Sequence, residues 1–120
     1  MKDFRQLIVW NKAHTLVKAI YFITKEFPKE EMFGLTSQLR RASSSIPTNI
    51  AEGCGRGSDA DFKRFLQIAF GSANEVEYLL LLTYELGYYK KEDYIKYTSE
   101  LVDVKKLLAS FIKKLSAVSQ

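Results

Sequence analysis

The residues of this chain that could do chemistry are mainly its basic side chains. Lysine and arginine number 18 against 14 Asp and Glu residues, which leaves a formal net charge of +4 over 120 residues. Clustered ammonium and guanidinium groups are typical of surfaces that contact phosphates, and such contacts do not read base sequence. The candidate nucleic-acid-binding residues are Arg56, Lys63, Arg64, Lys113 and Lys114.

The sequence contains no recognisable set of catalytic residues. Cys54 has no basic histidine partner that would make it a nucleophile. A di-iron site in a helical bundle needs Glu-x-x-His on two helices, and the single histidine, His14, does not have that spacing. The sequence therefore predicts a non-enzymatic protein with no metal site and no cofactor.

The glycine-rich run at residues 53–57, GCGRG, invites comparison with a phosphate-binding loop. Such a loop follows a strand and ends in Gly-Lys-Ser or Gly-Lys-Thr, whereas this run follows a predicted helix and has neither ending. A helix-to-helix turn is the favoured interpretation. The alternative is that backbone amides at the start of the next helix hold a phosphate beside Arg56.

Polar residues within the helical segments form a second candidate group. Arg40 and Arg41 lie mid-helix beside an apolar stripe, and a carboxylate at Glu75 or Glu77 falls at similar height on the neighbouring antiparallel helix. An Arg–Glu ion pair is the structural interpretation, and a phosphate contact in an assembled ring is the functional alternative. Two further polar residues, near the end of the same helix, are expected to cap or cross-link backbone. The predicted structural polar network comprises Arg40, Arg41, Asn49, Glu52 and Glu75.

Four helices are predicted to position these side chains, because apolar residues recur every three or four positions in four segments. The predicted helices run from about residue 3 or 7 to 26, from 35 to 53, from 59 to 86 and from after residue 91 onward. No segment alternates with period two for long enough to indicate a strand, and the connections are short. The sequence therefore predicts an all-α, antiparallel up-down-up-down four-helix bundle that forms a single domain over residues 1–120.

Local signals mark the helix ends and one irregular helix. Ser58 is a candidate N-cap with Asp61 three residues on, and the glycines of residues 53–57 could take the left-handed conformation that often ends a helix. Within the second helix, Ser43 to Ser45 and then Pro47 disfavour helix. We therefore expect tertiary packing to hold this helix, with a kink near the three serines.

The third and fourth predicted helices carry more apolar residues than one bundle face requires. Phe65, Leu79, Leu82 and Leu86 widen the stripe of the third helix. A stripe of this width indicates burial against several neighbours, either inside the bundle or at a subunit interface.

An up-down-up-down topology places most of the net positive charge at one end. Ten basic residues are counted there: Lys2, Arg5, Lys12, Arg56, Lys63, Arg64, Lys105, Lys106, Lys113 and Lys114. Against five carboxylates, ten minus five leaves +5, whereas eight minus nine leaves −1 at the opposite end. One hypothesis is that the end with the glycine-rich run faces a polyanion. The alternative is that surface lysines fall unevenly by chance.

Several sequence motifs together resemble a known family. They are VWNKA at 9–13, FP at 27–28, GLTSQLRRA at 34–42, SIPTNIAEG at 45–53 and the region from FL at 65–66 to ANE at 73–75. This set resembles the four-helix-bundle family of large-subunit rRNA intervening-sequence proteins and, more distantly, the accessory proteins of diversity-generating retroelements. The latter resemblance implies a ring-shaped homopentamer with a basic surface that binds nucleic acid and a partner protein.

Two functional hypotheses follow. The first is a non-enzymatic, homo-oligomeric protein that binds RNA or DNA, or serves as an accessory protein, through phosphate contacts at its basic end. The alternative is a homo-oligomeric protein-interaction scaffold without a nucleic-acid role. We expect a cytoplasmic location and no membrane association, because the first residues do not resemble a signal peptide and no apolar run approaches membrane-spanning length.

Overall fold

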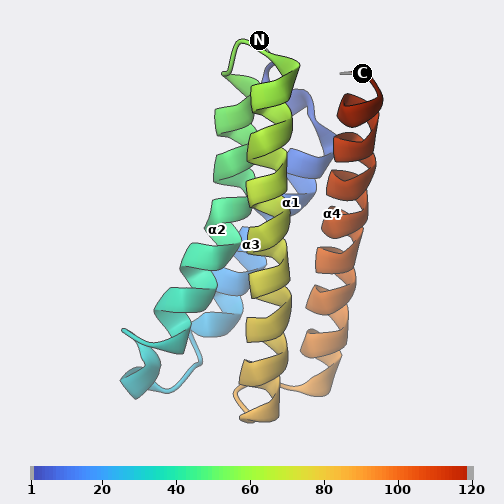
Figure 1. Ribbon diagram of the computed structural model, residues 1–120. Helices are drawn as coiled ribbons and strands as arrows, with labels where there is room; N and C mark the ends of the chain where they lie inside the picture. The colour runs from blue at the N-terminus through green and yellow to red at the C-terminus, as the bar shows by residue number, and fades with distance from the viewer. Residues whose placement is uncertain (1, 119–120) are drawn as a thin grey trace.

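Four antiparallel helices form the molecule in the computed structural model, which describes residues 2–118 (Figure 1). The helices are α1 (Ile8–Thr24), α2 (Leu35–Cys54), α3 (Asp59–Glu85) and α4 (Lys91–Val118), with short 3-10 turns at η1 (Phe4–Gln6) and η2 (Lys29–Glu31). Each helix packs against the next in sequence, and α4 also packs against α1. The bundle measures 47 × 23 × 20 Å. This arrangement confirms the predicted all-α antiparallel bundle.

One continuous core lies between the four helices, and it contains the predicted apolar seams. Fully buried side chains come from every helix, for example Leu16, Ile46, Leu80 and Leu108. In α4, Tyr97 is buried and Tyr94 is partly buried against the same cluster. Spacings of three and four therefore identified the buried face of each helix correctly.

The first helix begins later than the earliest predicted position. Asp3 accepts a hydrogen bond from the backbone N–H of Arg5 and so starts the separate turn η1. Leu7 is then extended, with φ −86° and ψ 129°, and α1 begins at Ile8. An extended residue between two helical turns breaks the hydrogen-bond ladder, which is why the two segments do not merge.

The second helix continues through Pro47, as predicted. Pro47 is buried inside α2, and neighbouring serines bond back to the helix: the hydroxyls of Ser43 and Ser44 donate to the carbonyls of Arg40 and Arg41. Figure 1 shows the first half of α2 slanting away from α3 and the second half running beside it. Proline and back-bonded serines are recognised causes of such a bend.

A glycine in the left-handed conformation ends α3. The prediction of such a glycine at the end of α2 is wrong. The C-cap of α2 is Gly55 in a right-handed conformation with φ −85°. Among the described residues, Gly87 is the only glycine with positive φ, at 83°. It completes a Schellman motif at the end of α3, in which Tyr88 N–H donates to the Thr83 carbonyl and Gly87 N–H to the Tyr84 carbonyl. Ser58 does cap α3 as predicted, because its hydroxyl accepts from the Asp61 N–H at 3.1 Å.

Several large apolar side chains remain exposed on the bundle. On α3 they include Ile68, Tyr78, Leu81 and Leu86, whereas Leu79 is buried in the core. The wide stripe of this helix is therefore only partly accounted for by packing within one chain. No helix within residues 2–118 combines the length and apolar character needed to cross a membrane.

At the end of the bundle with the α1–α2 and α3–α4 connections, one carboxylate joins the two. Tyr88 Oη donates to Glu31 Oε2 at 2.7 Å, and the Leu35 N–H donates to Glu31 Oε1 at 3.1 Å. Both bonds favour the charged form, so they lower the pKa of Glu31 below its ordinary value, and the same contact raises the pKa of Tyr88.

This contact should make stability depend on pH in the acid range. A carboxylate whose pKa is lowered by folding contributes stability above its unfolded pKa, and that contribution is lost as pH falls through the folded pKa. We expect the free energy of unfolding to be higher for the wild type than for Tyr88→Phe at neutral pH. The difference should shrink as pH falls below the ordinary glutamate value. Chemical denaturation over a pH series measures this, with the exposed Tyr78→Phe as control. A difference independent of pH would contradict the role of Glu31.

Candidate nucleic-acid interface

The five predicted phosphate-contacting residues lie at one end of the bundle, here called the basic end. Figure 1 shows the α2–α3 turn, the start of the chain and the last turns of α4 at this end. The backbone N–H of Lys2 donates to the Cys54 carbonyl at 3.2 Å, which ties the start of the chain to the end of α2. The antiparallel topology therefore brings basic residues from three separated segments to the same end.

One basic residue counted at this end belongs to the middle of the bundle instead. Lys105 Nζ lies 2.7 Å from Glu77 Oε1, so these two residues, which the sequence assigned to opposite ends, form an ion pair between α4 and α3. Without this pair, nine basic residues against five carboxylates leave +4 at the basic end, and eight against eight leave zero at the other. The formal net charge of the chain is thus still concentrated at the basic end.

Two arginines at the basic end gather around one aromatic ring. The guanidinium carbons of Arg56 and Arg64 lie 4.8 and 4.6 Å from the centroid of the Phe65 ring. Each arginine also has a carboxylate partner: Arg56 lies 3.4 Å from Glu52, and Arg64 lies 3.6 Å from Asp61. The ring and the carboxylates hold both guanidinium groups, but the carboxylates also cancel their charge locally.

The position of Phe65 depends on a glycine of α2. A Cβ atom added at Gly53 would lie 2.9 Å from both Phe62 Cδ1 and Phe65 Cβ. Only a residue without a side chain therefore lets the end of α2 approach α3 this closely. This close approach fixes the position of Phe65, and the Phe65 ring in turn positions Arg56 and Arg64.

The three predicted lysines differ from the two arginines in having no carboxylate partner within the described residues. Lys113 and Lys114 are exposed and Lys63 is half-buried, and none of the three forms a salt bridge within the described residues. The Phe62 and Phe111 rings meet edge to face at 5.2 Å, which sets the register of α3 against α4. The net positive charge here comes from lysines rather than from the paired arginines.

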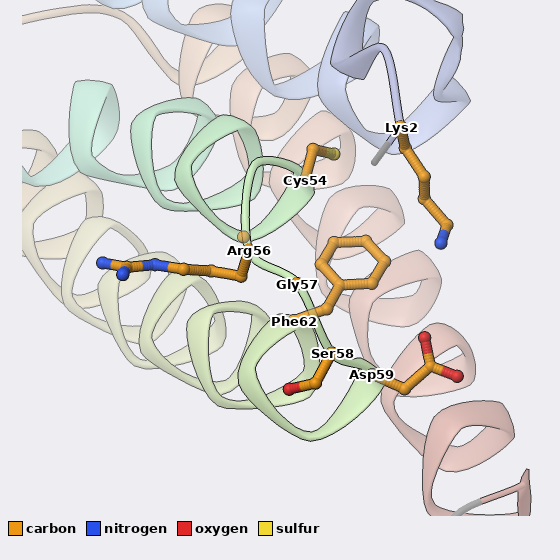
Figure 2. Close-up of a pocket in the computed structure, with 8 residues that line it drawn as sticks. Lys2, Cys54, Arg56, Gly57, Ser58, Asp59 and Phe62 are labelled. Atoms are coloured by element: carbon orange, nitrogen blue, oxygen red, sulfur yellow. The ribbon is translucent and has the colours of Figure 1, made fainter.

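The hollow at the α2–α3 turn does not support the phosphate-cradle alternative. It has a volume of about 310 Å³ and is lined by Lys2, Arg56, Asp59 and Phe62 among others. Figure 2 shows the Arg56 side chain extending away from Lys2 and Asp59, on the other side of Phe62. One of the amides at the start of α3 is already engaged, because the Asp61 N–H donates to Ser58 Oγ at 3.1 Å. A helix-to-helix turn is the interpretation that the geometry supports.

The predicted pairing of Arg40 with a glutamate of α3 is wrong. Arg40 instead turns toward α1, where its Nε donates to Thr24 Oγ1 at 2.8 Å and its guanidinium lies 4.7 Å from the Tyr21 ring centroid. Thr24 is buried and can accept this bond while its own hydroxyl donates to the Ile20 carbonyl. Arg40 therefore joins α2 to α1.

The other predicted network residues lie along α2 and the facing side of α3. Arg41 and Glu75 line a common hollow, although no salt bridge joins them within residues 2–118. Between them, the hydroxyls of Ser45 and Ser72 share a hydrogen bond of 2.8 Å. Asn49 Nδ2 donates to the Ser45 carbonyl at 2.8 Å, one turn earlier in the same helix, so it bonds backbone within α2. Glu52, by contrast, pairs with Arg56.

Cys54 is buried, and this burial raises the pKa of its thiol, which disfavours the reactive thiolate. Within residues 2–118, no three His, Cys, Asp or Glu side chains are placed to hold a metal ion.

A stack of aromatic rings beside the basic end was not anticipated from the sequence. The Trp10 ring centroid lies 4.8 Å from that of Phe4 and 4.8 Å from that of His14, with Trp10 and His14 nearly parallel at 16°. The four-residue spacing of Trp10 and His14 was a local signal for their contact. Phe4, however, comes from η1, and its place depends on the extended residue Leu7.

Comparison with known proteins identifies similar chains. A family model described as 23S rRNA-intervening sequence protein matches residues 5–110. A solved structure, described as a protein with unknown function from the S23 ribosomal protein family of Bacteroides thetaiotaomicron, is 32% identical with a TM-score of 0.80. The match covers 88% of this chain and 99% of that chain. No curated protein matches. The two matches span most of the bundle and agree with the four-helix architecture.

Proposed function

The chain belongs to the 23S rRNA-intervening sequence protein family, and we propose that it is a non-enzymatic, homo-oligomeric accessory protein of the cytoplasm that binds RNA or DNA. Binding takes place at the basic end through phosphate contacts. The observation that supports this proposal is the concentration of net charge, +4 at one end and zero at the other. Lys63, Lys113 and Lys114 are the main contacts, because no carboxylate of the described residues pairs with them.

Arg56 and Arg64 contribute to this surface in a different way. Their guanidinium groups are held against Phe65, so little side-chain freedom is lost when they contact a phosphate. The phosphate has to compete with Glu52 and Asp61 for them. We therefore assign them a smaller share of the affinity than the three lysines.

A homo-oligomer, in keeping with the pentamer implied by the retroelement resemblance, would repeat the basic end several times. The exposed apolar residues of α3, among them Ile68, Tyr78 and Leu86, supply a surface for contact between subunits. Repetition strengthens phosphate binding, since linked weak sites engage one polyanion together.

A protein-interaction scaffold is the second candidate, and one observation favours it. At the opposite end, Phe33 is 97% exposed, and two further apolar residues are exposed near it in sequence: Phe22 in the last turns of α1 and Met32 in the α1–α2 connection. Apolar side chains exposed to this extent are typical of protein contacts. In that case the positive charge serves solubility alone.

Equilibrium binding across a salt series distinguishes the two candidates. We expect labelled structured RNA and duplex DNA to bind the wild type with an affinity that falls steeply with salt, with a slope of about −0.9 per duplex phosphate contact. The variant Lys63→Glu/Lys113→Glu/Lys114→Glu should lose well over tenfold in affinity and reduce the slope magnitude by about 3, one unit per lost contact.

The matched control changes the net charge equally at the other end. Lys29→Glu/Lys90→Glu/Lys91→Glu replaces three exposed lysines there and should keep most of the affinity and nearly the full slope. Equal losses in the two variants would show that only net charge matters. Failure of the wild type to bind at low salt would reject the nucleic-acid proposal and leave the scaffold.

A further inference from the structure

A groove runs between α1 and α2 beside the basic end, and neither the phosphate contacts nor the core accounts for it. Its volume is about 520 Å³, within the range typical of ligand sites. Apolar side chains and polar side chains both line it. The apolar ones are Phe4, Trp10, Val17, Pro47 and Ala51, and the polar ones are His14, Ser44, Thr48 and Glu52.

The aromatic part of the groove is held in place and yet accessible. Trp10 is partly buried against the core, which fixes its ring, and His14 is exposed and stacks on it nearly in parallel. The outer face of the imidazole ring is thus free to receive another flat ring. Base stacking on aromatic side chains works in this way, and any base suffices because every base has a π face.

Basic groups flank the same groove at the end nearest the α2–α3 turn. The guanidinium of Arg5 lies 4.6 Å from the centroid of Phe4 and pairs with Asp3 at 3.1 Å, and Arg56 lies 3.4 Å from Glu52, so a phosphate has to compete with a carboxylate for each arginine. Phe4 and Glu52 both line the groove, so each arginine contacts a residue of the groove wall. An occupant that combines a flat ring with phosphates on either side matches this arrangement of rings and cations.

We propose that the groove binds an unpaired nucleobase of a single-stranded nucleic acid, stacked on His14 and Trp10. The hydroxyls of Ser44 and Thr48 and the Glu52 carboxylate are available to bond the edge of the base, and Arg5 and Arg56 contact the flanking phosphates. This proposal rests on the proposed function and names the part of the nucleic acid that is recognised. A base within a duplex is stacked on its neighbours and does not reach the groove.

The single tryptophan makes the groove directly observable, because Trp10 is the only source of tryptophan fluorescence in the chain. The experiment titrates the full chain with a single-stranded oligonucleotide and with an abasic oligonucleotide of equal length, which has the same phosphates and no bases. We expect the base-containing strand to quench Trp10 and to bind about 5- to 150-fold more tightly, the range for stacking of one base.

Substitutions at His14 then test stacking without removing the fluorophore. His14→Ala should lower the preference for the base-containing strand and leave binding of the abasic strand unchanged, whereas His14→Phe should keep the preference. Thr15→Ala, at the adjacent exposed position on α1, is the control and should behave as the wild type. Circular dichroism of each variant confirms that the helices are intact.

Three results would overturn the proposal, and they separate it from the proposed function. Equal binding of both strands with no change in Trp10 emission keeps the phosphate contacts and removes the base site. Absence of binding by either strand removes both. An emission change that follows protein concentration alone, together with dissociation of the oligomer in His14→Ala, identifies the groove as a contact between copies of the chain.

Discussion

Leu80→Ala is expected to lower the free energy of unfolding by about 2–5 kcal/mol, the usual range for truncating a buried leucine. Leu80 lies in the C-terminal part of α3 with 0% of its surface exposed, in the core that joins the four helices. The hydrogen bond that its carbonyl accepts from Tyr89 Oη belongs to the backbone and is retained in the variant. The loss should therefore come from the removed apolar groups and the cavity they leave, and not from a broken hydrogen bond. Urea denaturation at fixed protein concentration measures it.

The adjacent residue provides the control for this experiment. Leu81 is 38% exposed, so Leu81→Ala removes the same atoms from the same helix without leaving a closed cavity. Its loss should stay below about 1 kcal/mol, because substitutions of surface residues have small effects. If the two variants lost equal stability at concentrations that preserve the oligomer, then Leu81 would be buried as well, and a subunit contact on that side of α3 would be the explanation.

The core of this fold could be predicted from the sequence because the spacing of apolar residues indicates which face of each helix is buried. The seam of α4 needed no knowledge of its neighbours, and the N-cap of α3 needed only Ser58 and the residues that follow it. Even α2, whose Pro47 opposes helix formation, was predicted correctly. Its apolar stripe buries Leu39, Ile46 and Ile50, and this burial outweighs the local preference against helix.

Side-chain partners across helices could not be predicted in the same way. Arg40 was expected on the α3 side, but a long side chain on a helix surface can reach either neighbour, and the buried Thr24 hydroxyl on α1 receives it. Glu77 and Lys105 were assigned to opposite ends although they touch, because counting by halves of a helix ignores residues near the middle. Both errors arise because two properties depend on how the helices pack: the register of one helix against another, and the neighbour toward which a long side chain extends.

The candidate site, too, could be predicted from the sequence only in part. Topology was sufficient to bring to one end the segments that carry Arg56, Lys63, Arg64, Lys113 and Lys114, namely the α2–α3 turn, the start of α3 and the last turns of α4. It did not reveal that two of them are paired with carboxylates and that three are not. The groove beside Trp10 was missed altogether, because its wall includes Pro47 and Ala51 of α2, whose side chains could equally have faced the core. Spacing identifies helix faces, whereas a site between two helices depends on which faces meet.

Two alanine substitutions at helical glycines should change stability in opposite directions. At Gly53, the added Cβ would lie 2.9 Å from Phe65 Cβ, an atom fixed to the α3 backbone, so the helices have to separate. Overpacking of this kind typically costs about 1–3 kcal/mol. At Gly71, in the exposed middle of α3, the added Cβ would have no neighbour within 4 Å apart from the adjacent residues and the backbone of its own helix. Gly71→Ala should therefore stabilise the protein by up to about 1 kcal/mol, the difference in helix propensity.

The glycine pair also tests whether stability and the basic end are linked. Separation of α2 from α3 at Gly53 shifts Phe65, the ring against which Arg56 and Arg64 are held. Gly53→Ala should thus weaken nucleic-acid binding as well as folding, whereas Gly71→Ala should leave binding unchanged. Thermal unfolding and the salt-series titration, applied to both variants, measure the two effects. A stable Gly53→Ala protein would show that Phe62 and Phe65 can move aside. Destabilisation by Gly71→Ala would show that another subunit packs against this exposed face of α3.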